Sequence, residues 1–99
     1  MNKEEIKEEI EKQVALFADA TDANGLANSI NGITSALQSV KIDKMQKAGV
    51  ELLIGYVQKT MTDAAILKIQ GKYDAASKNA VAVAVSYVIP NVLGMGIFE

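Results

Sequence analysis

Residues 23–40, ANGLANSINGITSALQSV, decide how this chain folds, and they contain no charged side chain. Residues 79–98, NAVAVAVSYVIPNVLGMGIF, contain none either. A helix on the surface of a soluble protein normally keeps a charged face toward water. Two long uncharged segments in one short chain therefore predict that both are buried or that both contact another surface.

The first segment predicts a helix over residues 25–40. Its aliphatic residues recur at alternating spacings of four and three, which is the spacing of a heptad seam. They are Leu26, Ile30, Ile33, Leu37 and Val40. The remaining side chains are small or carry amides, and Gly32 with Ala36 forms the small-xxx-small pair typical of close helix contact. Both a second interface and a merely neutral polar face are compatible with this pattern.

Two further helices flank this segment. Over residues 3–20, Ile6, Ile10, Val14 and Phe17 share one face, so we expect an amphipathic helix with its charges in water. Residues 44–70 carry two apolar stripes, which predicts a long central helix contacted on both sides. One stripe runs through Met45, Gly49, Leu52, Tyr56 and Thr60, and the other through Val50, Ile54, Val57, Met61 and Ala64 or Ala65. We expect this helix to be capped by Asp43 with Gln46, and Glu51 to pair with Lys47 one turn earlier.

The last uncharged segment allows three structures. Residues 74–89 form a helix that ends before Pro90, with an apolar tail over residues 91–99. The alternation of Ala and Val also fits a β-hairpin, because a short apolar run cannot be assigned by periodicity alone. Residues 79–98 are also as long as the roughly 20 residues that cross a bilayer. The helical context upstream favours the helix.

Composition excludes several function classes. The chain has 99 residues and a net charge of −2, and it lacks Cys and His. It therefore has no disulfide framework, no thiolate and no imidazole for catalysis or for zinc. All ten positive charges are Lys, so the bidentate contacts by which Arg recognises phosphate and guanine are missing, and nucleic acid is not expected as a partner. No nucleotide, metal or catalytic motif is present, which predicts neither cofactor nor enzyme activity.

We therefore expect a single all-α domain over residues 1–99, a compact four-helix bundle with an apolar tail. The expected function is that of a small non-enzymatic structural or interaction protein, which forms a homo-oligomer or docks on a protein partner. The expected contact residues are Asn28, Gly32, Ser35, Ala36, Val92, Leu93, Ile97 and Phe98. Two alternatives remain open: a membrane-associated protein whose residues 79–98 insert in a bilayer, and a binding protein with an apolar ligand cavity between its helices. The acidic N-terminus lacks an apolar signal region, which favours the cytoplasm or an assembly over a membrane.

Overall fold

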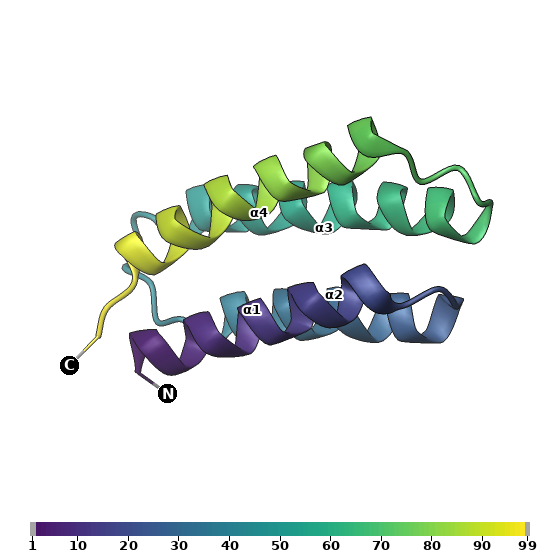
Figure 1. Ribbon diagram of the computed structural model, residues 1–99. Coiled ribbons are helices and arrows are strands. Elements are labelled where there is room, and N and C mark those ends of the chain that lie inside the picture. Colours follow the sequence, from purple (N-terminus) through teal and green to yellow (C-terminus); the bar gives the residue numbers. More distant parts are fainter. Residues whose placement is uncertain (1, 99) are drawn as a thin grey trace.

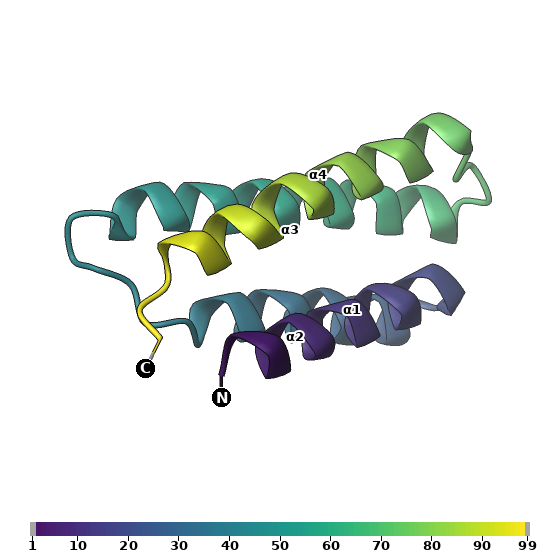
Figure 2. The same cartoon turned by 60° about the vertical axis from the view of Figure 1, so that its left-hand side comes forward.

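The chain runs through four helices, α1 (Lys3–Asp19), α2 (Ala23–Gln38), α3 (Lys47–Ile69) and α4 (Ala75–Met95). They are seen in a computed structural model that describes residues 2–98. Figure 1 shows two layers: the α1–α2 hairpin forms one, and the α3–α4 hairpin forms the other. The rotated view in Figure 2 shows the same two layers, with both chain ends beside the α2–α3 connection. The predicted four-helix bundle is confirmed, and no strand occurs in residues 2–98, so the hairpin alternative was wrong.

Polar side chains set the first residue of three helices. The Asn2 side chain accepts a hydrogen bond from the Glu5 amide at 2.9 Å, and the Glu5 carboxylate accepts one from the Asn2 amide at 3.2 Å. Asp22 caps α2, and Asp74 accepts from the Ser77 amide at 2.9 Å to cap α4. Each cap satisfies a backbone donor that would otherwise have no partner at the helix start. Because Asp22 is the cap, α2 begins two residues before the predicted position.

The start of α3 differs from the prediction. Asp43 accepts a hydrogen bond from the Met45 amide at 2.9 Å, which forms a local turn in place of the predicted capping box. The helix therefore begins at Lys47 and not at residue 44, and Gln46 makes no side-chain cap. At the other end Gly71 adopts a φ of 70°, a left-handed conformation that favours glycine, and the Lys72 amide bonds to the Leu67 carbonyl.

One continuous core lies between the two layers. Every aliphatic residue of the predicted α2 seam is buried, and these residues pack with the apolar stripes of the other helices. The largest fully buried side chains are Phe17, Ile10, Leu26, Ile33, Leu37, Met61, Val57, Val88 and Val92. The first uncharged segment is therefore an internal element on its apolar side, as its periodicity indicated.

Helix α4 does not end before Pro90. It continues to Met95, so the predicted helix end at residue 89 and the tail from residue 91 were wrong. A proline inside a helix costs about 3 kcal/mol, because it removes one backbone hydrogen bond and crowds the preceding turn. The next turn buries Val92 and Leu93, and burial of an aliphatic side chain contributes about 1.5–3 kcal/mol. The burial of two such side chains offsets the cost of the proline. In the next turn, the Asn91 side-chain amide donates to the Tyr87 carbonyl at 2.6 Å.

The residues after α4 are attached to the α2–α3 connection. The Ile97 amide donates to the Lys41 carbonyl at 2.7 Å, and Gly96 forms an isolated antiparallel bridge with Ile42. A Cβ atom at Gly96 would collide with the Phe98 ring and would lie 2.6 Å from Val40. The glycine therefore permits the chain to cross closely over Val40. Of the predicted tail, Glu99 lies outside the described residues.

Candidate functional site

The small residues of α2 make a contact inside the molecule. A Cβ atom built at Gly32 would lie 2.6 Å from the Gln13 side chain of α1, so the close approach that the Gly32–Ala36 pair permits is between α1 and α2. Both residues are half-buried there. Asn28 and Ser35, the other predicted contact residues of this helix, are exposed. Of the four predicted contact residues on α2, these two are therefore the exposed ones.

The predicted contact residues at the C-terminus are likewise partly buried in the molecule and partly exposed. Val92 and Leu93 are 0% and 3% exposed, so they belong to the core and present no surface to a partner. Phe98 is half-buried against Gly96, whereas Ile97 is 48% exposed. The prediction that Val92 and Leu93 form an outer contact surface was wrong, because the turn after Pro90 is helical and faces inward.

A different apolar surface lies on the outer side of the α3–α4 hairpin. Leu52 and Tyr56 are one turn apart on α3, Val83 and Tyr87 are one turn apart on α4, and all four are exposed. We call these four residues the outer face. Further along the hairpin, a groove between the same two helices is lined by Thr60, Asp63, Ala64 and Leu67 of α3, and by Ser77 and Ala80 of α4.

Residue spacing from the groove places the two pairs of the outer face on neighbouring turns of α3 and α4. Tyr56 and Leu52 lie one and two turns before Thr60, and Val83 and Tyr87 lie one and two turns after Ala80. Because α3 and α4 are antiparallel (Figure 1), residues that precede Thr60 and residues that follow Ala80 run in the same direction away from the groove. Leu52 is 77% exposed and Tyr87 is 55% exposed, so large apolar side chains of this surface are in contact with water. The sequence showed the Leu52–Tyr56 stripe but not that Val83 and Tyr87 lie beside it.

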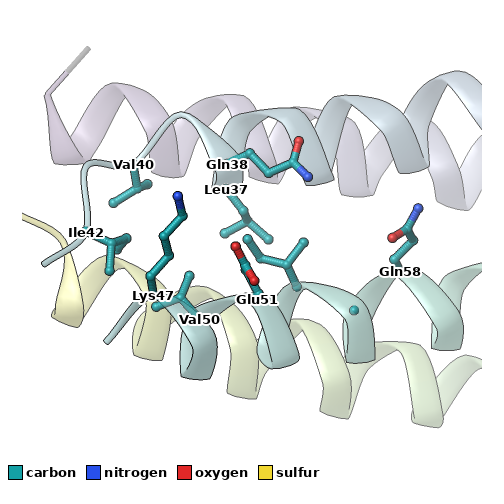
Figure 3. Close-up of a pocket in the computed structure, with 10 residues that line it drawn as sticks. Leu37, Gln38, Val40, Ile42, Lys47, Val50, Glu51 and Gln58 are labelled. Atoms are coloured by element: carbon teal, nitrogen blue, oxygen red, sulfur yellow. The ribbon is translucent and has the colours of Figure 1, made fainter. Parts of the chain in front are cut away.

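A pocket of about 530 Å³ opens between the end of α2 and the first half of α3 (Figure 3). This volume lies in the range of roughly 300–1,000 Å³ that small-molecule sites occupy. The pocket is lined by the aliphatic residues Leu37, Val40, Ile42, Val50 and Ile54, and by the polar residues Gln38, Lys47, Glu51 and Gln58. Gly55 completes the lining, and a Cβ atom there would meet nothing within 4 Å. The pocket thus has an apolar floor and a polar rim, and sequence periodicity carries no signal for it.

Family models, curated proteins and solved structures all give no match. The site must therefore be interpreted from its own residues. Residues 2–98 contain no group of three or more acidic, His or Cys side chains placed to hold a metal ion.

The two charged residues at the pocket rim do not pair with each other. Lys47 and Glu51 are one turn apart on α3, yet they form no ion pair among residues 2–98, contrary to the prediction. Lys59 and Asp63 have the same spacing on the same helix and pair at 3.0 Å. Figure 3 shows the Lys47 ammonium extended toward the end of α2 and the Glu51 carboxylate pointing into the hollow beside Leu37.

Lys68 joins the two layers at the opposite end of the bundle. Its ammonium donates to the carbonyl oxygens of Phe17 at 3.0 Å and Ala18 at 2.8 Å, in the last turn of α1. That turn has no basic residue of its own, so a cation from α3 stabilises the negative end of the α1 dipole. The ammonium also lies 4.9 Å from the centroid of the Tyr73 ring. Burial lowers the pKa of Lys68, an effect that Asp19 opposes and Lys78 reinforces.

Within the described residues one helix, α4, has the length and apolar composition needed to cross a membrane. Core helices of soluble proteins meet the same criterion. The residues that α4 buries recur at helical spacing and pack against the rest of the bundle; they are Val81, Ala84, Val88, Ile89, Val92 and Leu93.

Proposed function

We propose that this protein is a small non-enzymatic interaction protein that self-associates through the outer face of its α3–α4 hairpin. The observation that supports this proposal is the row of four exposed apolar side chains: Leu52, Tyr56, Val83 and Tyr87. Single exposed apolar residues are normal on a protein surface, but a contiguous group of them marks an interaction site. Tyr is also enriched at protein interfaces, because it combines a large apolar ring with a hydroxyl group.

Charge favours a second copy of the chain as the occupant. In a two-fold symmetric dimer, the same patch lies on both sides of the interface, so any charge near its centre faces an identical charge. Residues 79–98 carry no charge, and the four outer-face residues are all uncharged. On the same side of α3, Lys59 and Asp63 are charged, but they pair with each other at 3.0 Å. The hairpin therefore presents no net charge here that would repel a second copy or select a strongly acidic or basic partner.

The size of the face suits a reversible association. Helix α4 has 21 residues, which corresponds to a length of about 30 Å, and two helices lying side by side are about 20 Å wide. The whole outer side of the hairpin, of which the outer face is the apolar part, thus covers on the order of 600 Å² per copy, slightly below the roughly 800 Å² per partner of a standard specific interface. We therefore expect an oligomer whose population rises with protein concentration.

Charge substitutions on the outer face test this proposal by sedimentation velocity. The double variant Leu52→Glu with Tyr87→Glu should be monomeric at concentrations where the wild type associates, since it places carboxylates opposite carboxylates. The charge-matched comparison is Leu52→Glu alone against Ser35→Glu on α2, since each adds one carboxylate to an exposed position and only the first lies on the outer face. Dissociation by Ser35→Glu alone would assign the interface to α2, as first predicted from the sequence, and would contradict the proposal.

The length and composition of α4 favour a second candidate, membrane association through residues 79–98. Insertion of α4 would remove its buried stripe from the core, so the helix cannot complete the bundle and cross a bilayer at the same time. Deletion of residues 79–99 separates the two functions. A folded, helical fragment 1–78 that loses vesicle binding would support an anchor, whereas an unfolded fragment would show that α4 is needed for the fold.

A further inference from the structure

We propose that the pocket between α2 and α3 binds a free α-amino acid that has a large apolar side chain. The geometry provides an apolar hollow whose rim carries one cation, Lys47, and one anion, Glu51. An α-amino acid presents the complementary set: an apolar side chain, a carboxylate and an ammonium on neighbouring atoms. This site is separate from the outer face and does not depend on self-association.

The floor of the pocket supplies the apolar part of the recognition. Leu37, Val40, Val50 and Ile54 are buried in the protein core, and they form the bottom of the hollow. A ligand side chain placed over them would remove its own apolar surface from water, which is the main source of affinity in such sites. The opening above Gly55 leaves room for a ring or a branched chain, because nothing lies within 4 Å of that position.

The rim supplies charge complementarity for both ends of a zwitterion. Lys47 and Glu51 lie one helical turn apart, where Cβ atoms are about 5–6 Å from each other. A ligand whose carboxylate meets the Lys47 ammonium and whose ammonium meets the Glu51 carboxylate spans such a gap. The two residues are free to make these contacts because they do not pair with each other within residues 2–98. A ligand of one charge would attract one of them and repel the other.

The Gln38 side chain faces the same hollow from α2, and Gln58 lies further along α3. Their amides accept and donate hydrogen bonds, so they suit a zwitterion better than a purely apolar molecule. An apolar molecule could contact the floor of the pocket, but it would leave the polar groups of the rim without partners. The rim therefore favours a ligand that also carries polar groups.

Titration of the full-length protein with L-phenylalanine, followed by amide chemical shifts in NMR spectra, tests the proposal. Saturable shifts should be confined to the end of α2, residues 39–46 and the first half of α3. Three analogues dissect the recognition: 3-phenylpropanoate lacks the ammonium, 2-phenylethylamine lacks the carboxylate, and glycine lacks the side chain. Each should bind about tenfold more weakly, or more weakly still, since every analogue removes one of the three contacts.

Variants assign the binding to this pocket. Lys47→Met and Glu51→Gln each remove one rim charge and should weaken L-phenylalanine about tenfold, while Gly55→Phe should fill the hollow and abolish binding. Lys59→Met, a surface lysine of the same helix outside the pocket, should leave the Kd unchanged. Rim positions are exposed, so their variants keep the test valid even if Gly55→Phe fails to fold. The proposal is overturned if no saturable shift occurs up to about 10 mM ligand, or if 3-phenylpropanoate binds as tightly as L-phenylalanine.

Discussion

The helical turn after Pro90 is the part of the fold that a single substitution tests best. Leu93 is 3% exposed and packs in the core, so Leu93→Ala leaves a cavity there. Leu-to-Ala substitutions at such positions cost about 2–5 kcal/mol. We expect about 3 kcal/mol here, because this turn lies near the end of the bundle where neighbouring side chains can partly relax. For a domain of this size, such a loss lowers the Tm by roughly 12–24 °C.

Urea unfolding followed by far-UV circular dichroism measures this cost directly. Protein concentration must be equal in all samples, because self-association would add a concentration-dependent contribution to stability. The matched control is Ile97→Ala, a nearby aliphatic residue that is 48% exposed and should change the free energy of unfolding by less than about 0.5 kcal/mol. Equal, small effects of both substitutions would refute the conclusion that the chain after Pro90 completes the core.

Three further predictions concern the helices. Gly49→Ala and Gly55→Ala should each raise the free energy of unfolding by about 0.5–1 kcal/mol in urea titrations, because both glycines lie inside α3 with nothing within 4 Å of the added methyl group. Lys68→Met should destabilise the protein by about 1–2 kcal/mol, since it removes the cation and both hydrogen bonds at the α1 C-terminus; an unchanged urea midpoint would show that this contact is not stabilising. Hydrogen bonds from Ser77 lower the pKa of Asp74 from 3.8, so Asp74 stabilises the folded state above that pH, and its contribution is lost as the pH falls through the lowered pKa. Asp74→Asn should therefore give a shallower fall of stability in acid, and an identical acid profile for both proteins would contradict this role.

Much of the fold could be predicted from residue spacing alone. The seam from Leu26 to Val40 and the stripe from Ile6 to Phe17 are buried as expected. Only one face of each helix is apolar, so that face packs in the protein core. Asp74 caps the start of α4 and Gly71 ends α3, as predicted. Both roles depend only on residues a few positions away in the chain, so they can be predicted from the sequence. The end of α4 could not be predicted, since the local cost of Pro90 is exceeded by burial of residues that follow it.

The candidate sites were harder to predict, because they depend on which helices become neighbours. Gly32 indicated a close helix contact correctly, but its partner is Gln13 of the same chain. Leu52 and Tyr56 formed a visible stripe on α3, while their continuity with Val83 and Tyr87 depends on the antiparallel pairing with α4. The pocket at Lys47 results from the relative position of two helix ends, to which no sequence pattern corresponds.

Solution mass tests the proposed self-association most directly. We would measure the full-length protein by light scattering, without detergent, across a tenfold range of concentration. The account predicts a mass that rises with concentration toward a defined multiple of 10.6 kDa. A constant mass of 10.6 kDa over the whole range would contradict it, and would leave the outer face as surface without a second copy to cover it.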